Sequence, residues 1–297
     1  MNTHNAASGV SAVARLMADP DDQRICLSRV RPLDGWPVLA DPVLPIRTIA
    51  VVDTETEGLD PRLHKVIEIA VAFAEIDAHG RIVRVAGKGE ALNDPGRPLT
   101  PQIRDLTGLT DAMLAGQRIN VDHVAKRLNA VDVIVAHNCA HDRPFVEALL
   151  PDLQDKPWVC SMANADWSAW GFDGKKQDHL LMQAGLFNPI KHRALADVAS
   201  LVSLLNLETP TGNSVLSECI AHAKKPTWLF RAEGLPYDYR QGIKDRGWRW
   251  NSSDRVWWTE VPHSDRAAEE QWYDQAFRPF RAKPVIDRVT WTTRYKR

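Results

Sequence analysis

The chain has 297 residues, of which 44% are hydrophobic and 25% charged, and its formal net charge is −1. This length suits one ordinary domain and a second small one, and the apolar content is enough for a buried core. The balanced charge argues against a uniformly basic nucleic-acid-binding protein, and no segment approaches the roughly 20 apolar residues of a membrane-spanning helix. No apolar run near the N-terminus resembles a signal peptide, so we expect a cytoplasmic protein.

Charge differs between the two ends of the chain. Residues 208–297 contain 16 Lys or Arg against 12 Asp or Glu, whereas the rest contains 21 against 26. An acidic catalytic part with a basic appendage would have this distribution. The four cysteines include no CxxC pair, so we expect buried thiols rather than a zinc site or disulfides.

The first part of the chain predicts an extension followed by an α/β domain. Residues 1–46 are expected to form an extension and linker, with a short helix over 10–17 and four prolines between residues 32 and 45. Runs and alternations of apolar residues predict strands over 48–54, 65–76, 81–87, 132–136 and 158–162. Helices are predicted over 101–106, 111–115, 121–130, 143–150, 179–184 and 194–205. Strands first, then alternating helices and strands, predict a mixed five-stranded sheet flanked by helices over 47–207.

The C-terminal part has a different composition. Seven of the 11 tryptophans lie after residue 220. We predict a helix over 239–245 and a hairpin formed by 248–250, an NSSD turn and 256–261, within a small α+β domain over 208–277. Residues 278–297, with seven Lys or Arg and one Asp, are predicted to be a partly ordered basic tail.

Four acidic residues are spaced along the predicted elements in a way that suits a metal site. Asp53 and Glu55 stand two apart at a strand end, so their side chains share one face of the strand. That end is where ligands bind in α/β sheets. Asp142 follows the fourth strand by a few residues. Asp197 lies within an apolar helix, where an unpaired carboxylate would be costly.

One histidine stands close to the last of these acids. His192 precedes Asp197 by five residues, and within one helix this spacing would place the two side chains about 140° apart. Both can therefore face one site only if His192 lies in the loop before the helix or in its first turn. Oxygen ligands suit Mg²⁺ or Mn²⁺. Two ions roughly 4 Å apart would flank a phosphodiester, one activating the attacking water and the other stabilising the leaving 3′ oxygen. Histidine, which titrates near neutral pH, suits the general base.

The ordered set D-x-E, H-N-x-x-x-D and H-x-x-x-x-D resembles the DEDDh branch of the DnaQ-like 3′→5′ exonucleases over roughly residues 47–207. This family has a ribonuclease H-like fold and includes the proofreading subunit of bacterial replicative polymerase. The resemblance implies that Asp53, Glu55, Asp142 and Asp197 hold the metals and that His192 is the base. The sister DEDDy branch has Tyr four residues before the last Asp, where this chain has Arg193. The leading hypothesis is therefore an enzyme that releases nucleoside monophosphates from single-stranded 3′ ends, since an end fits a closed pocket, with DNA as the favoured polymer.

Neighbouring residues are candidates for substrate binding. In the family, the turn containing Thr54, Thr56, Gly58 and Leu59 lies against the 3′-terminal nucleotide, although Gly58 also suits ordinary turn chemistry. His137 and Asn138 end the fourth strand and either contact substrate or cap the next helix.

The tryptophan-rich segment GWRWNSSDRVWW is similar to a small module appended to some bacterial DnaQ-like exonucleases. It suits a nucleic-acid platform on which aromatic rings stack on bases and arginines meet phosphates. The candidate residues are Trp248, Trp250, Trp257, Trp258, Arg246, Arg249 and Arg255. The tryptophans could instead close the core of a small domain or dock a partner protein.

Three functions therefore remain open from sequence. The first is a metal-dependent 3′→5′ exonuclease in DNA repair, proofreading, RNA turnover or phage defence. The second is a non-catalytic nucleic-acid-binding adaptor that kept the fold, against which the intact acids argue. The third is a phosphodiesterase for short oligonucleotides or RNA. The sequence does not separate DNA from RNA, because that choice depends on what meets the 2′-hydroxyl.

Overall fold

The computed structural model describes residues 26–235, 240–252, 254–278 and 283–296. The chain divides into two compact units. Of the described residues, the first unit contains 26–222 together with 295 and 296, and the second contains the rest up to Arg294. Within these described ranges, no helix combines the length and apolar character needed to cross a bilayer.

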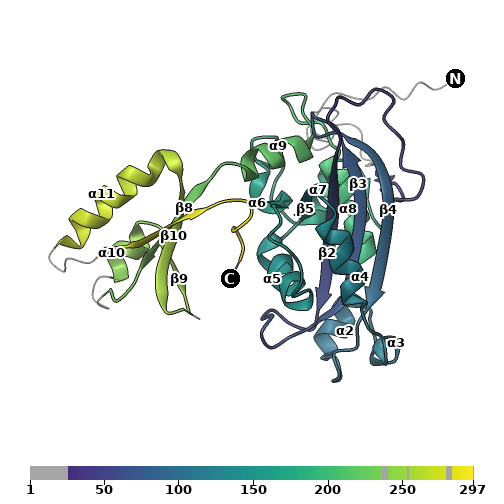
Figure 1. Cartoon of the computed structure of the whole chain (residues 1–297), viewed down its shortest axis with the longest axis horizontal. Coiled ribbons are helices and arrows are strands. Elements are labelled where there is room, and N and C mark those ends of the chain that lie inside the picture. The colour runs from purple at the N-terminus through teal and green to yellow at the C-terminus, as the bar shows by residue number, and fades with distance from the viewer. Residues whose placement is uncertain (1–25, 236–239, 253, 279–282, 297) are drawn as a thin grey trace. The chain divides into compact units, whose positions relative to one another are not determined.

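A five-stranded sheet forms the centre of the first unit (Figure 1). Its strands, in sheet order, are β4 (Ile82–Leu92), β3 (Val66–Ile76), β2 (Arg47–Thr56), β5 (Val133–Ala136) and β6 (Trp158–Cys160). The first three form an antiparallel meander, whereas β5 runs parallel to β2 and β6 runs parallel to β5. The predicted mixed five-stranded α/β sheet is confirmed.

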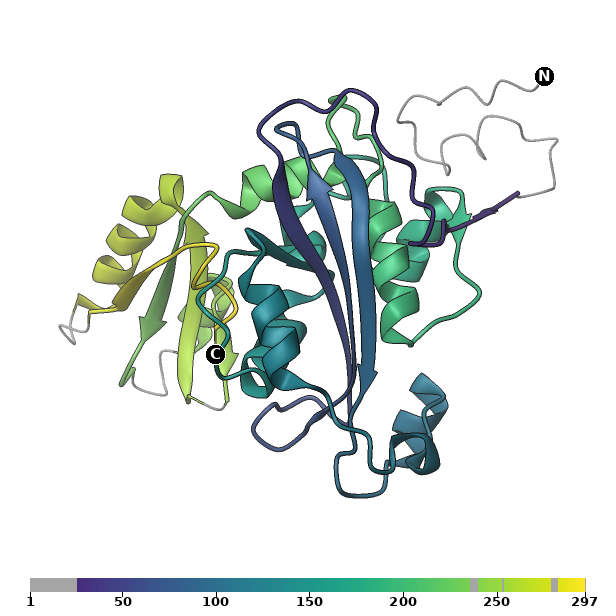
Figure 2. The same cartoon turned by 45° about the vertical axis from the view of Figure 1, so that its right-hand side comes forward.

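Helices cover both faces of this sheet (Figure 2). The helices described in this unit are α2 (Pro101–Thr107), α3 (Asp111–Leu114), α4 (Val121–Asn129), α5 (Cys139–Leu149), α6 (Ser161–Asn164), α7 (Gln177–Gln183), α8 (Ala194–Leu205) and α9 (Val215–Ala223). Alternation along β2 decides which side chains meet which helix. Ala50 and Val52 join a core cluster with Phe145 and Val146 of α5. The residues between them on β2 therefore face the opposite side, where α8 contacts β2 and β3.

Helices α2 and α3 begin at threonine residues that cap their first turns. Thr100 caps α2 by accepting a hydrogen bond from the Ile103 N–H, and Pro101 occupies the first turn, where a missing N–H costs nothing. Gly108, with φ of +68°, ends α2. Thr110 then caps α3 by accepting from the Met113 N–H.

The described part of the N-terminal extension packs on the first unit rather than forming a separate linker. Strand β1 (Ser28–Arg29) pairs in parallel with β7 (Leu186–Phe187). Val30, Leu33 and Trp36 are buried. The helix predicted over 10–17 lies outside the described residues.

The boundary between the units falls at residues 222/223 instead of the predicted 207/208. The reason is helix α9, which was not predicted from the sequence and which packs on the first unit. Its Val215, Leu216 and Cys219 are at most 1% exposed. The Ser214 hydroxyl, just before the helix, donates a 2.9 Å hydrogen bond to the Gly80 carbonyl in the turn between β3 and β4.

The second unit is a four-stranded antiparallel sheet with helices. Its strands, in sheet order, are β11 (Val285–Val289), β8 (Thr227–Ala232), β10 (Val256–Pro262) and β9 (Arg249–Asn251). Its helices are α10 (Arg240–Asp245), the 3-10 turn η2 (His263–Asp265) and α11 (Arg266–Ala276). The predicted hairpin is present as β9 and β10, and the small α+β domain is confirmed.

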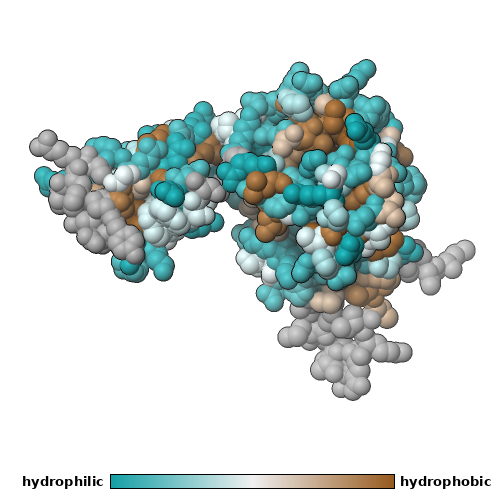
Figure 3. All heavy atoms as spheres, turned by 90° about the horizontal axis from the view of Figure 1, so that it is seen from below, coloured by the Kyte–Doolittle hydropathy of each residue, from teal (hydrophilic) through white to brown (hydrophobic). Residues whose placement is uncertain are grey.

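The predicted basic tail is wrong for residues 285–289, because β11 pairs with β8 inside this sheet. The expected buried thiols are found at Cys139, Cys160 and Cys219, whereas Cys26 is exposed. On the face drawn in Figure 3, hydrophilic residues predominate and hydrophobic patches lie between them.

Candidate active site

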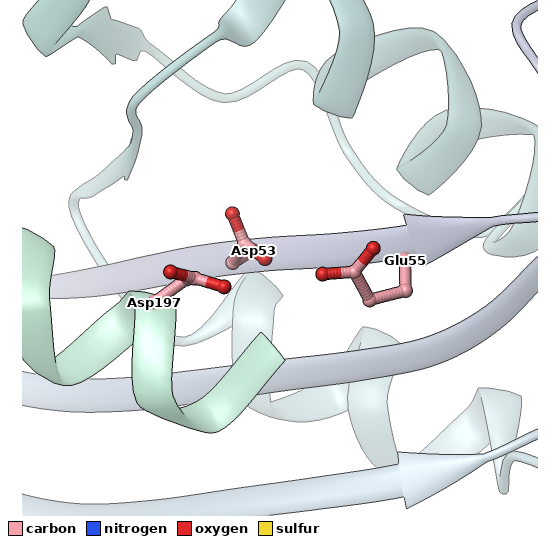
Figure 4. A group of neighbouring side chains, drawn as sticks. All are labelled: Asp53, Glu55 and Asp197. Carbon is pink, nitrogen blue, oxygen red and sulfur yellow. The ribbon is translucent and has the colours of Figure 1, made fainter. Parts of the chain in front are cut away.

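Three of the predicted acids converge where β2 meets α8. Ligand oxygens of Asp53, Glu55 and Asp197 all lie within 4.8 Å of one another. Figure 4 shows Asp53 and Glu55 side by side on the strand, with Asp197 reaching them from the helix. The two strand residues share a face because they are two apart, and that face is the one covered by α8.

The fourth predicted acid, Asp142, lies next to this cluster but approaches from the other side of β2. It is 3% exposed and sits in the first turn of α5, which begins at Cys139, four residues earlier than predicted. Its Oδ1 accepts a 2.9 Å hydrogen bond from the Thr54 hydroxyl. Thr54 faces α5 because it alternates with Asp53 and Glu55. The acid cluster proper therefore contains three carboxylates, with Asp142 as a buried neighbour.

Burial and mutual repulsion raise the pKa values of these acids. Desolvation, followed by the charge of Asp197, raises the pKa of Glu55 to about 8. Desolvation, followed by the charge of Asp142, raises the pKa of Asp53 well above its ordinary range. Desolvation also raises the pKa of Asp142 to about 7, although the Thr54 hydrogen bond opposes this rise.

Asp197 carries the smallest of the four rises. Desolvation raises its pKa to about 6, and the positive charge of His192 and hydrogen bonds from the backbone of residues 192 and 193 oppose that rise. Carboxylates that repel one another without a counter-charge are the donor set that a divalent cation stabilises. The residues present therefore fit a divalent metal.

His192 lies in the loop before α8, as the spacing from Asp197 requires. Its φ is +54°, in the left-handed region that a non-glycine residue rarely adopts. Its side chain is exposed. Arg193, the next residue, occupies the N-cap position of α8, so the start of that helix fixes where the histidine stands.

Two residues that hydrogen-bond to the start of α8 and to Asp197 were not predicted from the sequence. Glu68 of β3 is fully buried, pairs across the strands with Glu55, and accepts hydrogen bonds from Arg193 at 2.8 and 3.1 Å and from the Ala194 N–H at 2.9 Å. Gln177 at the start of α7 donates a 2.8 Å hydrogen bond to the Asp197 carbonyl. Glu68 stood inside an apolar strand pattern, and nothing in the sequence linked it to Arg193.

The predicted substrate-binding residues divide into internal and accessible ones. His137 is buried, and its two ring nitrogens bond the Ser161 hydroxyl and the Lys175 carbonyl, each at 2.7 Å. Thr56 donates a 2.7 Å bond to the Gly58 carbonyl. These contacts are structural.

Two of the six candidates, Leu59 and Asn138, are open to a ligand. Leu59 is 86% exposed. Asn138 is exposed and makes no side-chain cap hydrogen bond to α5. Gly58 has a packing role, because a Cβ there would lie 2.4 Å from the His64 ring.

The platform residues of the second unit are separated by the fold. Trp248 is buried and donates a 2.6 Å hydrogen bond from Nε1 to Glu269, which also pairs with Arg246. Arg249 lies over the ring of Trp258. Because Arg249 is the cross-strand partner of Trp258 and alternates with Trp250, this pair faces the opposite side of the sheet from Trp250 and Trp257.

The family follows from a match over more than half of the chain. Residues 50–205 match the RNase_T family, described as exonuclease. The chain therefore belongs to the RNase_T exonuclease family, a family of hydrolases.

Curated relatives carry the same similarity over a limited part of their length. The PolC-type DNA polymerase III of Listeria monocytogenes is 37% identical over 102 residues, covering 33% of this chain and 7% of the relative. That of Bacillus subtilis is 35% identical over 118 residues, covering 38% and 8%. The chain thus spans less than a tenth of the length of these two polymerases.

Solved structures with a similar arrangement include two exonucleases. The zinc-bound complex of Escherichia coli exonuclease I with single-stranded DNA has a TM-score of 0.49 and 16% identity, covering 62% of this chain and 47% of that one. Exonuclease X in complex with 5′-overhanging duplex DNA has a TM-score of 0.41 and 24% identity, covering 57% and 99%.

Proposed function

We propose that the protein is a metal-dependent 3′→5′ exonuclease that releases nucleoside monophosphates from single-stranded 3′ ends, with DNA favoured. The observation that carries the proposal is the convergence of the ligand oxygens of Asp53, Glu55 and Asp197 within 4.8 Å. Membership of the exonuclease family supports it. The similarity to PolC-type DNA polymerase III favours DNA as the polymer.

The three converging acids would hold Mg²⁺ or Mn²⁺, with Asp142 beside them. Two such ions, when bound, would supply Lewis-acid stabilisation on both sides of the scissile phosphate. The chain's own contribution is to keep the carboxylates together in a partly buried site. Thr54 donates a hydrogen bond to the Asp142 carboxylate, and Gln177 holds the backbone carbonyl of Asp197. His192 Nε2 or Nδ1 would take the proton of the attacking water, since the loop before α8 leaves its ring accessible.

The decisive experiment follows 3′- and 5′-labelled DNA and RNA, single- and double-stranded, with Mg²⁺, with Mn²⁺ and with EDTA. We expect stepwise shortening from the 3′ end of single-stranded DNA, and none in EDTA. Asp53→Ala and Asp197→Ala should each lose more than about 100-fold in rate, since even residues outside the metal shell cost 10- to 100-fold.

Asp105→Ala is the matched control, because Asp105 is exposed on α2, outside the acid cluster. It should retain wild-type activity. Wild-type protein that hydrolyses no labelled end would contradict the proposal and leave the binding-adaptor function. Faster hydrolysis of dinucleotides than of long strands would instead favour the phosphodiesterase for short oligonucleotides.

A further inference from the structure

The second unit contains a pocket of about 450 Å³. It lies between the end of β8, the start of α10 and the β9–β10 hairpin, and its lining includes Leu235, Arg240, Trp250, Arg255 and Trp257. This volume lies within the roughly 300–1,000 Å³ of pockets that bind small ligands. The lining combines an aromatic pair with two cationic side chains.

The aromatic pair, Trp250 and Trp257, lies at the edge of the core of this unit and leaves ring surface exposed to solvent. That core is built from buried Phe230, Ile243, Trp248, Tyr273 and Phe277. Trp250 is 50% exposed, and Trp257 is partly buried at the edge of the cluster. Their ring centroids lie 5.5 Å apart at an interplanar angle of 58°. The register pairs Trp250 directly with Trp257, which holds both rings on the same side of the sheet.

One arginine of the hairpin region, Arg255, lines this pocket. Arg246 is committed to Glu269 at 2.9 Å, and Arg249 lies over Trp258 at 4.7 Å. Arg255 lines the pocket and has an exposed side chain. Arg255 has φ of +52°, an uncommon conformation for a non-glycine residue that places it at the hairpin turn.

We propose that this pocket binds a base of a single-stranded nucleic acid, stacked against Trp250 and Trp257, while Arg255 contacts a neighbouring phosphate. Aromatic faces accept any base, and arginine supplies charge for the backbone, so the site is independent of sequence. The inference rests on the proposed function in taking nucleic acid as the substrate polymer. It narrows the seven predicted platform residues to three, namely Trp250, Trp257 and Arg255.

The test measures binding of a fluorescently labelled oligothymidylate strand to the full-length chain in EDTA, by anisotropy over a range of salt concentrations. Trp250→Ala should weaken binding about 5-fold or more, the loss that removal of one base-stacking ring produces. Trp250→Phe keeps a ring and should restore most of the affinity. Arg255→Ser should weaken binding and lower the salt dependence by about one phosphate contact.

Arg249→Ser is the matched control, because it removes the same charge from the same hairpin but on the other face of the sheet. It should leave the salt dependence unchanged. Far-ultraviolet circular dichroism and melting temperatures establish that each variant is folded. Wild-type affinity in folded Trp250→Ala and Arg255→Ser would overturn the proposal and leave the pocket to a protein partner.

Hydrolysis of a dinucleotide with Mn²⁺ separates this proposal from the exonuclease function. The pocket variants should cleave the dinucleotide at the wild-type rate, because one short substrate does not need the second unit. If the wild-type chain cleaves nothing while the variants lose affinity for the strand, the exonuclease proposal fails and the pocket stands. If cleavage occurs and the variants bind as the wild type does, the pocket proposal fails alone.

Discussion

Glu68 is the residue that joins the sheet to the loop carrying His192. Its fully buried carboxylate accepts hydrogen bonds from both the Arg193 guanidinium and the Ala194 N–H. Arg193 and Ala194 directly follow His192, so this ion pair fixes the backbone that presents the proposed base. Glu68 is thus a positioning residue: it acts on the site through Arg193.

We expect Glu68→Gln to lower the free energy of unfolding by about 2 kcal/mol, the worth of a hydrogen bond to a charged group. The rate constant kcat should fall about 10-fold or more with KM little changed, because small displacements of a catalytic group are costly. Urea denaturation and steady-state kinetics measure the two effects. Glu75→Gln removes an arginine pair from the same strand, but that pair with Arg84 is partly exposed, so its loss should cost less than about 1 kcal/mol. Equal effects of the two variants would contradict the positioning role.

The acid cluster makes stability depend on pH in the opposite sense to ordinary carboxylates. The pKa values of Glu55, Asp142 and Asp197 are raised by desolvation to about 8, 7 and 6. Unfolded carboxyls titrate near 4. Between those limits the folded protein binds more protons than the unfolded chain, so the free energy of unfolding falls as pH rises from about 4 to about 8.

We therefore expect metal-free protein in EDTA to be less stable at pH 8 than at pH 5 by at least about 1.4 kcal/mol, the equivalent of one pKa unit. Mg²⁺ or Mn²⁺ should raise the melting temperature more at pH 8 than at pH 5, because the cation competes with protons for the same oxygens. Thermal denaturation at the two pH values measures both effects. Asp53→Asn should flatten the dependence. A melting temperature that is the same at both pH values and insensitive to metal would argue against a shared site.

At the scale of elements, the turn between β3 and β4 is fitted against α9. A Cβ on Gly80 would lie 2.9 Å from Cα and Cβ of Ser217, and the φ of Gly80 is +73°. The turn and the helix therefore constrain each other. This contact explains why α9 belongs to the first unit although turn signals precede it in the sequence.

We expect Gly80→Ala to destabilise the protein by more than about 2 kcal/mol. A left-handed alanine costs about 1–2 kcal/mol, and the contact with the α9 backbone adds to that cost. Gly35→Ala is a matched control, since Gly35 has φ of +78° and a Cβ there meets nothing within 4 Å. The difference between the two variants in urea denaturation isolates the packing cost. Equal losses would mean that α9 yields freely.

Sequence patterns predicted the elements that follow a local rule. Strand β3 alternates or runs apolar throughout, and α8 is framed by His192 and an apolar stripe, so both were predicted close to their observed bounds. The candidate site residues were also predictable, because each lies on or next to an element that the sequence pattern predicts. They are Asp53, Glu55, Asp142, His192 and Asp197. Residues with a characteristic spacing along such elements can be identified from the sequence.

Elements that depend on distant partners were missed. Strand β11 (VIDRV) carries charges and gains its structure from pairing with β8, more than fifty residues earlier. The role of Glu68 depends on Arg193, which lies 125 residues away. Asp142 approaches the acid cluster from the α5 side of β2, because its hydrogen-bond partner Thr54 alternates with Asp53. The sequence does not show on which side of β2 the helix α5 packs. Spacing alone does not specify such long-range pairings.

At the scale of the whole molecule, each unit has a core of its own. The first is built on the five-stranded sheet with α4, α5 and α8, and the second on Phe230, Trp248 and Tyr273. The first unit also includes Tyr295, which packs against the cluster that contains Phe145, and Lys296, which pairs with Asp155. The acid cluster and the aromatic pocket thus lie in different compact units of one chain.

We expect a chain shortened to residues 1–222 to fold and to hydrolyse a dinucleotide at close to the wild-type kcat. Its affinity for long single strands should fall at least as far as that of full-length Trp250→Ala, because the whole pocket is gone.

The truncation also removes Tyr295, so the melting temperature of the shortened chain needs a reference variant. Full-length Tyr295→Ala supplies it, with an expected loss of about 1.5 kcal/mol for a partly buried aromatic ring. If the shortened chain is less stable than this reference by several kcal/mol, or cannot cleave the dinucleotide, the second unit contributes to the fold or the chemistry of the first. If it binds long strands as tightly as the full chain, the strand is held by the first unit alone.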